Sequence, residues 1–394
     1  MMKPTIKIIN GDIIQPYSII SRGNLLISDG IIKQISAKKI SSRADIVIDA
    51  EGKFVSPGFI DIHIHGGGGS DFMDGTVKDF LTVAETHARF GTTAMTPTTL
   101  SCDKQHILHS IEVFREANKK NIYGSAYLGL HLEGPYFSID QRGAQDEKYI
   151  KNPHKNEYRE IILKGSDVIK RWSAAPELKG SLEFGSFLRR FNILPSIAHT
   201  NGTYDDVIGA FENGYTLATH FYSSMSGVSR RNAFRTTGVI EAVYLVDEID
   251  VEVIADGVHL PDPLLQLILK VKGFDKTALI TDAMRAAGTN VNQSVLGGRQ
   301  NGLKVIIEDG VAKLLDRSSF AGSIATTDRL LRTVLKLPGV SIIDAIRMMS
   351  LTPARIMKIE SKKGSVSIGK DGDIVLFDSN TNIHSVIIEG SIIL

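Results

Sequence analysis

Cysteine is almost absent from this chain of 394 residues, and Cys102 is the single example. One cysteine excludes an internal disulfide and is consistent with a reducing cytosol. The first residues contain no positively charged segment followed by an apolar core, so we expect no signal peptide and a cytoplasmic protein. No apolar run approaches the roughly 18 residues of a membrane span, so we expect no transmembrane helix.

Net charge is also nearly absent, because 45 basic residues stand against 44 acidic ones. A formal charge of +1 gives no electrostatic reason to expect a nucleic acid or an anionic membrane as partner. Hydrophobic residues make up 42% and charged residues 23% of the chain, which is typical of a globular protein with a filled core. A Gly-x-Gly-x-x-Gly motif after a strand is missing, and this disfavours a doubly wound dinucleotide-binding sheet.

Both ends of the chain carry short strand patterns separated by turns. Examples are residues 5–9 and 31–35 near the start and residues 373–377 near the end. Neither end is long enough for a sheet with its own core. We therefore expect residues 1–54 and 362–394 to fold together into one small β-sandwich domain.

The middle of the chain, residues 55–361, alternates strand and helix patterns. The strand-like runs end at His65, Thr98, Glu133, Glu177, His199, His220, His259 and Asp282. Helical patterns between them cover residues 76–89, 103–118, 182–190, 203–212 and 262–271. This α/β alternation predicts a (β/α)8 TIM-like barrel, in which functional groups collect at the C-terminal ends of the strands. A doubly wound open sheet is the structural alternative.

Residues that bind transition metals gather at these predicted strand ends. His63 and His65 are two positions apart, so a strand directs both side chains to one face. His199 and His220 are separated by about one loop, helix and strand, so a barrel places them on neighbouring strands. Neutral imidazoles together with the carboxylate of Glu133 are donors that zinc prefers.

A single histidine after an apolar strand is more often a core or rim residue than a ligand. Here five of the eleven histidines fall at predicted strand ends, and carboxylates join them, which makes a chance arrangement a poor explanation. We expect His131 to point into the barrel interior without binding a metal. The other histidines have helical or polar surroundings and are expected to face solvent; they are His87, His106, His109, His154 and His384.

These motifs resemble the amidohydrolase superfamily and, within it, the deacetylases of N-acetylated amino-sugar phosphates. The resemblance covers nearly the whole chain. It rests on residues 57–66, 91–98, 131–135, 175–177, 198–201, 218–222, 254–259 and 281–283. The His-Leu-Glu-Gly-Pro element at residues 131–135 is specific, whereas the His-x-His element occurs throughout the superfamily.

The resemblance implies a metal-dependent hydrolase, active as a homodimer, that converts N-acetylglucosamine 6-phosphate into glucosamine 6-phosphate and acetate. It implies that Glu133, His199 and His220 bind the catalytic divalent metal, expected to be Zn²⁺. His63 and His65 would complete a second metal site, so one or two ions per subunit are expected. Asp282 would be the general acid and base, although a role as metal ligand is equally open, and His259 would hold the substrate.

Phosphate recognition is expected from Arg231, which matches a family arginine that contacts the sugar phosphate, often across a dimer interface. A guanidinium suits phosphate because its donors bind in pairs. The chain departs from the family pattern at Ser223 and Ser224, after His220, and at Gln145, where a histidine is usual. We expect these three residues at the substrate, and the departures keep N-acetylgalactosamine 6-phosphate open as an alternative.

Two further functions stay open at this point. One is another amide or cyclic-amide hydrolase of the superfamily, similar to dihydroorotases or aminoacylases; Glu133 argues against the carboxylated lysine that dihydroorotase-like sites often contain. The other is an inactive barrel that binds a sugar phosphate or serves as a scaffold, and the complete ligand set argues against it. Residues 288–322, rich in glycine and asparagine, are either a hairpin lid or a surface insertion.

Overall fold

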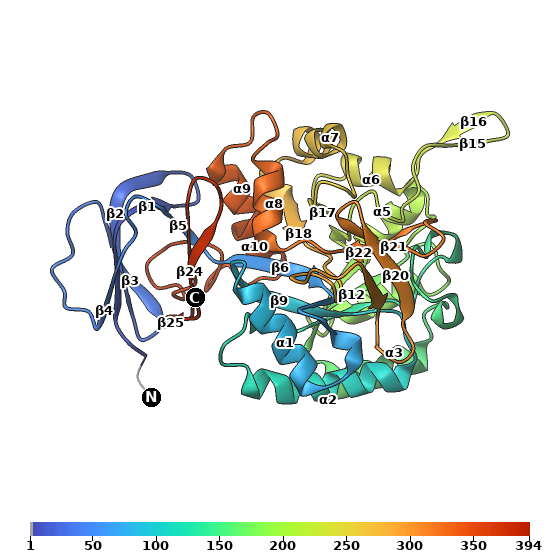
Figure 1. Cartoon of the computed structure of the whole chain (residues 1–394). Helices are drawn as coiled ribbons and strands as arrows, with labels where there is room; N and C mark the ends of the chain where they lie inside the picture. Colours follow the sequence, from blue (N-terminus) through green and yellow to red (C-terminus); the bar gives the residue numbers. More distant parts are fainter. Residues whose placement is uncertain (1–2) are drawn as a thin grey trace.

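The computed structural model describes residues 3–394, apart from the side chain of Arg231. In it, strands from both ends of the chain form one small sheet (Figure 1). The strands are β1 (Ile6–Ile14), β2 (Ile19–Ser28), β3 (Ile31–Ser36), β4 (Ile46–Asp49), β5 (Phe54–Pro57), β23 (Ile374–Phe377), β24 (Ile383–Ile388) and β25 (Ser391–Ile392). Their order is β25-β24-β23-β5-β1-β2-β3, with β4 beside β1. The chain ends thus share a sheet, while the two-layered sandwich stays a prediction.

Strand β5 joins this sheet to the rest of the molecule. It runs parallel to β1 and antiparallel to β23, with Ile374 opposite Pro57. Gly58 alone separates it from the next strand, and a Cβ atom at this position would lie 2.0 Å from Thr93 Oγ1. A glycine is therefore needed where the chain passes from one sheet to the other.

The middle of the chain forms a parallel, nearly closed barrel, and the predicted TIM-like fold is confirmed. Its strands are β6 (Phe59–Ile64), β9 (Thr92–Thr99), β11 (Leu130–Glu133), β12 (Ile169–Ala174), β13 (Leu194–Ile197), β14 (Leu217–Ala218), β17 (Asp250–Ile254) and β18 (Thr277–Ile280), and the short β10 (Ala126–Tyr127) also pairs with β9. They follow one another in this order around the barrel. Between the first and last strands, Asp282 N–H donates to the His63 carbonyl oxygen (3.0 Å).

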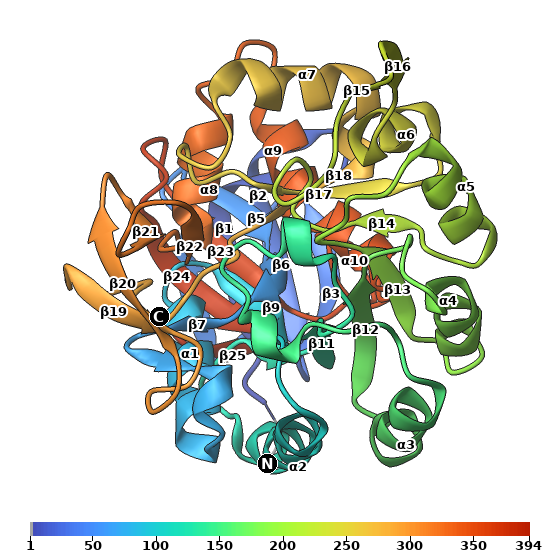
Figure 2. The same ribbon diagram turned by 90° about the vertical axis from the view of Figure 1, so that its right-hand side faces the viewer.

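Helices surround the barrel (Figure 2). They are α1 (Val77–Ala88), α2 (Lys104–Lys120), α3 (Lys155–Gly165), α4 (Ser181–Arg189), α5 (Tyr204–Glu212), α6 (Val239–Leu245), α7 (Asp262–Lys272), α8 (Thr327–Val334), α9 (Ile342–Met349) and α10 (Leu351–Ile356). Short 3₁₀ turns are η1 (Phe72–Asp74), η2 (Ile139–Gln141), η3 (Glu147–Tyr149) and η4 (Phe274–Lys276). The five predicted helical patterns correspond to α1, α2, α4, α5 and α7. Thr203 caps the start of α5 through a capping box with Asp206.

Three small additions stand at the barrel mouth. One is a hairpin of β15 (Ser229–Arg231) and β16 (Phe234–Thr236), which projects away from the barrel (Figure 1). Another is an antiparallel sheet of β19 (Gln293–Leu296), β20 (Leu303–Glu308), β21 (Val311–Leu314) and β22 (Phe320–Ser323), which occupies the segment expected as a lid or insertion. The third is the tight pair β7 (Gly66–Gly67) and β8 (Ser70–Asp71).

One expectation about the histidines is wrong. His87 is fully buried in α1, where its Nε2–H donates to the Gly66 carbonyl oxygen (3.0 Å). Burial lowers the pKa of His87 to about 4, so the ring is neutral. His106, His109, His154 and His384 are exposed as expected. Among residues 3–394, no helix has the length and apolar character to cross a membrane.

Candidate active site

The expected ligands leave the barrel strands at one end. Glu133 is the last residue of β11, and His65 directly follows β6. His199, His220 and Asp282 each lie two residues beyond the end of their strand, with φ angles of 45°, 32° and 47°. Non-glycine residues seldom adopt this left-handed conformation, and such strain clusters at functional sites. The backbone therefore turns sharply where each of these three side chains is presented.

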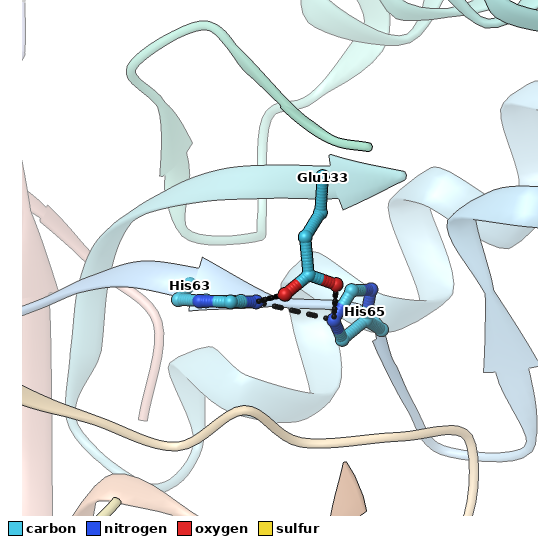
Figure 3. A group of neighbouring side chains, drawn as sticks. All are labelled: His63, His65 and Glu133. Atoms are coloured by element: carbon cyan, nitrogen blue, oxygen red, sulfur yellow. Dashed lines mark hydrogen bonds and ion pairs between the residues drawn. The ribbon is translucent and has the colours of Figure 1, made fainter. Parts of the chain in front are cut away.

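His63, His65 and Glu133 point toward one another in a first cluster (Figure 3). The two histidine Nε2 atoms are 3.2 Å apart. His63 Nε2 lies 3.3 Å from Glu133 Oε1, and His65 Nε2 lies 3.4 Å from Glu133 Oε2. All three side chains are buried, so their polar atoms face one another rather than water.

Glu133 also belongs to a second cluster, with His199 and His220. Its Oε1 atom lies 3.0 Å from His220 Nε2 and 3.5 Å from His199 Nε2. The Nε2 atoms of the two histidines are 3.2 Å apart. One carboxylate therefore connects both clusters, which is the arrangement expected for two neighbouring metal sites.

The spacing of these donor atoms fits a divalent metal. Zn–N and Zn–O bonds of about 2.0–2.1 Å in a tetrahedral site place the ligand atoms roughly 3.3 Å apart, close to the separations seen in both clusters. The outer nitrogens are held as well: His65 Nδ1–H donates to the Thr98 carbonyl (3.2 Å) and His199 Nδ1–H to the Gln141 carbonyl (2.8 Å). Such partners leave Nε2 as the lone-pair donor. The residues present thus fit a metal of the zinc type.

The negative charges beside the first cluster also favour binding of a cation. Burial lowers the pKa of His63, but the negative charges of Glu133 and Asp282 raise it to about 9. For Glu133 the two effects have the opposite sign. Burial raises the pKa of its carboxyl group, and the surrounding histidines lower it well below its ordinary range. The carboxylates therefore stay ionised and attract a proton or a metal ion to the rings between them.

Asp282 lies beside both histidines of the first cluster. Its Oδ1 atom is 3.2 Å from His65 Nε2 and 3.5 Å from His63 Nε2. Burial raises the pKa of Asp282, but His63 and His65 lower it more, so the carboxyl group is ionised. Its side chain remains 13% exposed and lines the cavity in front of the ligands, where it can exchange a proton with a bound molecule.

A buried charged pair supports the first cluster from below, and the sequence analysis missed it. Arg171 on β12 donates to Glu252 on β17 from both terminal guanidinium nitrogens, and the contact from Nη2 measures 2.8 Å. Glu252 in turn accepts from His63 Nδ1–H (3.4 Å). The sequence shows a charged residue within each strand, but it does not show that Arg171 and Glu252 meet across the barrel. His131 points into the same interior, as expected, and bonds to Ser173 (2.7 Å).

The cavity in front of the ligands, here called the metal chamber, has a volume of about 210 Å³. His259, Gln145, Ser223 and Ser224 line it, so the structure brings these predicted substrate residues to the ligands. His259 Nδ1–H donates to Asp256 (2.8 Å), which leaves its Nε2 atom available. Gln145 donates to Glu133 Oε2 (2.8 Å) and so contacts the carboxylate that both clusters share. The roles of these residues toward substrate stay predictions.

Arg231, the predicted phosphate ligand, lies on the β15–β16 hairpin. Its backbone lies in β15, opposite Phe234, on the projecting hairpin. Its side chain lies outside the described part of the structure. The predicted contact with a phosphate therefore stays a prediction.

A parallel barrel with histidines and carboxylates gathered at its strand ends is typical of the class of metal-binding barrel enzymes. The model of the Amidohydrolase family matches residues 54–393, and the chain belongs to this family. The predicted family is thus confirmed.

Known proteins of similar sequence and structure agree with this assignment. The chain is 31% identical to an N-acetylglucosamine-6-phosphate deacetylase of Lysinibacillus sphaericus, over 92% of this chain and 91% of that protein. It is 28% identical to an N-acetylgalactosamine-6-phosphate deacetylase of Escherichia coli O157:H7, over 93% and 94%. The crystal structure of N-acetylglucosamine-6-phosphate deacetylase from Pasteurella multocida superimposes with a TM-score of 0.91 at 28% identity, covering 98% of this chain and 99% of that chain.

Proposed function

We propose that this enzyme hydrolyses the acetamide of N-acetylglucosamine 6-phosphate, giving glucosamine 6-phosphate and acetate. The observation that carries the proposal is the shared carboxylate of Glu133 between two histidine pairs, with Asp282 beside them. Relatives named for this activity match nearly the whole chain, which supports the choice of substrate.

Glu133, His199 and His220 are proposed to hold one Zn²⁺ ion, and His63 and His65 together with Glu133 a second. When bound, such an ion lowers the pKa of a water ligand from about 15.7 toward 7 and polarises a carbonyl oxygen. The donor set of imidazole and carboxylate supports zinc over the hard cations, which prefer oxygen alone.

Asp282 is proposed as the general base and acid. Its carboxylate, ionised and within reach of the metal chamber, takes a proton from the attacking water and returns it to the nitrogen of the leaving amine. The water oxygen forms the new bond to the acetyl carbon, and the C–N bond breaks. His259, held by Asp256 through Nδ1–H, accepts a hydrogen bond from the substrate at Nε2 and orients it.

Arg231 is proposed to bind the 6-phosphate, with Ser223, Ser224 and Gln145 contacting the sugar. The projecting hairpin that carries Arg231 supports a homodimer in which this arginine serves the neighbouring subunit. We further propose a cytoplasmic enzyme, since a single cysteine suits a reducing compartment. Residues 1–54 and 362–394 are proposed as a β-sandwich domain separate from the barrel of residues 55–361.

An acetate-release assay tests the proposal. Zinc-loaded enzyme is offered N-acetylglucosamine 6-phosphate, N-acetylgalactosamine 6-phosphate and their unphosphorylated forms, with and without a chelator. We expect the highest kcat/KM for N-acetylglucosamine 6-phosphate and loss of activity on chelation. Equal rates for all four compounds, or no release from any, would contradict the proposal.

A further inference from the structure

Gln145 connects Glu133 to the segment that follows β9. Its side chain is buried at the wall of the metal chamber. Its backbone is held in a turn, because Gln145 N–H donates to the Arg142 carbonyl oxygen (3.0 Å) and Arg142 Nη1 donates to the Gln145 carbonyl oxygen (3.3 Å). A buried side chain on a fixed turn is a rigid support for the group that it contacts.

The orientation of the Gln145 amide is set by the backbone of Ser101. Ser101 N–H donates to Gln145 Oε1 (2.8 Å), and a backbone N–H can only donate. The amide oxygen must therefore face Ser101, and Gln145 Nε2 donates in the other direction, to Glu133 Oε2 (2.8 Å). A primary amide nitrogen carries two hydrogens, so one of them stays available for the sugar contact proposed above.

The two carboxylate oxygens of Glu133 have different surroundings. Oε1 lies near three histidine Nε2 atoms, those of His220 (3.0 Å), His63 (3.3 Å) and His199 (3.5 Å). Oε2 lies 3.4 Å from His65 Nε2 and also accepts the hydrogen bond from Gln145. The contacts to the first cluster thus use both oxygens, whereas the contacts to the second cluster use Oε1.

The angle of the carboxylate plane therefore matters more to the first cluster than to the second. A carboxylate that turns about its last side-chain bond can still offer one oxygen to the second cluster. The first cluster needs Oε1 at His63 and Oε2 at His65 at the same time, so it depends on the angle at which the carboxylate is held. Loss of a partner that orients a metal ligand typically lowers metal affinity by about 10- to 100-fold.

We propose that Gln145 is a positioning residue that fixes the carboxylate plane of Glu133, and that it thereby supports zinc binding at the first cluster more than at the second. This inference rests on the two zinc sites of the proposed function. It gives Gln145 a role that does not require substrate, so zinc binding alone can test it.

The test is a titration of zinc into the metal-free full-length chain in competition with a chromogenic chelator. Gln145→Met keeps the length of the side chain but has no amide group. We expect it to weaken the binding of one of the two ions by about 10- to 100-fold and to change the other little. Gln145→Asn is too short to reach both partners, so it should give the same result, and it carries the test if the methionine variant does not fold.

Ser101→Ala is the matched control. It keeps the backbone N–H that orients Gln145 and removes a buried hydroxyl that has no hydrogen-bond partner among residues 3–394. Both zinc affinities should therefore match those of the wild-type chain.

A variant without the first cluster identifies the affected ion. The double variant His63→Ala and His65→Ala keeps the second cluster and should bind one zinc ion. Adding Gln145→Met to this double variant should change the affinity for that ion little, because the remaining contacts use a single carboxylate oxygen.

Each outcome bears on one of the two proposals. Unchanged affinity for both ions in Gln145→Met and Gln145→Asn overturns the inference alone. An equal loss with and without the first cluster also overturns it, since Gln145 would then act on the whole site and not through the carboxylate plane. A wild-type chain that binds fewer than two zinc ions overturns the two sites of the proposed function, and the inference with them.

Discussion

Arg171 and Glu252 form a fully buried ion pair inside the barrel, and the same glutamate holds the outer nitrogen of His63. The two residues come from β12 and β17, which are not neighbours in the sheet. Their contact therefore crosses the barrel interior directly beneath the first histidine cluster. A charged pair in this position links the packing of the barrel to the orientation of a proposed metal ligand.

Glu252→Gln should weaken both the fold and the first cluster. It leaves the Arg171 charge buried without its partner, a change that typically costs about 3–5 kcal/mol, and it frees the His63 ring. We expect a lower free energy of unfolding in denaturant titrations and fewer zinc ions per chain by elemental analysis. Asp250→Asn on the same strand is the control, because Asp250 pairs with the partly exposed Arg355 (2.7 Å) away from the ligands. Unchanged zinc content in Glu252→Gln would refute the positioning role.

Asp282→Asn should retain zinc and lose turnover. The amide keeps the size of the carboxylate but cannot take a proton at neutral pH, so kcat should fall by about 10²- to 10⁴-fold. Steady-state kinetics together with elemental analysis test this, with the exposed Asp316→Asn as control. An unaltered kcat would rule out the proton-transfer role. Loss of zinc would show that Asp282 acts mainly as a metal ligand.

Glu133→Gln should remove more metal than the loss of either histidine pair. Glu133 contacts both clusters, whereas the double variant His63→Ala and His65→Ala leaves Glu133, His199 and His220 in place. We expect the glutamine variant to bind little zinc and the double variant to keep about one ion. Equilibrium dialysis with elemental analysis measures both. Full zinc content in Glu133→Gln would contradict the assignment of the shared ligand.

Arg231→Ala should impair binding of the phosphorylated substrate selectively. Loss of a guanidinium partner for phosphate typically costs about 1.5–3 kcal/mol, which corresponds to a rise in KM of roughly tenfold or more. The KM for the unphosphorylated sugar should change little. Arg230→Ala, one residue earlier in β15, is the control. An equal rise for both substrates would show that Arg231 does not read the phosphate.

His87 should make the stability of the fold depend on pH. The pKa of His87 is about 4 in the folded chain and about 6.5 when unfolded, so below pH 6.5 the unfolded state binds more protons. Stability should be complete above pH 6.5 and fall as the pH drops toward 4, by roughly 3 kcal/mol in all.

The pH effect is measured by denaturant titration of metal-free protein between pH 7 and pH 4.5. His87→Gln should show a weaker dependence, because glutamine keeps a donor for the Gly66 carbonyl and does not titrate. His109→Gln on the exposed surface is the control and should behave like the wild-type chain. A slope that does not change in His87→Gln would contradict the prediction.

Much of the barrel and the convergence of its histidines and carboxylates could be predicted from the sequence, because strands of a parallel barrel end on one face. This rule alone brings His65, Glu133, His199 and His220 together, although they are scattered along the chain. Five of the ten helices described in residues 3–394 were also predicted from their sequence patterns, and α5 is one of them. Local signals and a single topological rule were sufficient in these cases.

Features that depend on packing were beyond the sequence patterns. His87 sits in a helix with a polar neighbourhood in sequence, yet the glycine turn after β6 covers it. Arg171 and Glu252 are charged residues on strands, and only their meeting across the barrel explains their burial. The β19–β22 sheet packs through a buried apolar cluster that includes Leu296, Val305 and Ala321, and Arg285 and Arg299 near it pair with residues more than two hundred positions earlier.

Strand β5 lies between β1 and β23, and after Gly58 it continues into the strand that carries His63. The last twenty or so residues of the chain include β23, which pairs with β5. They therefore help to hold the strand that leads into the first histidine pair. A premature stop near residue 372 deletes no ligand and no chamber residue. It nevertheless removes β23, the strand that pairs with one edge of β5, so we expect loss of the chain's end to disturb the placement of His63 and His65.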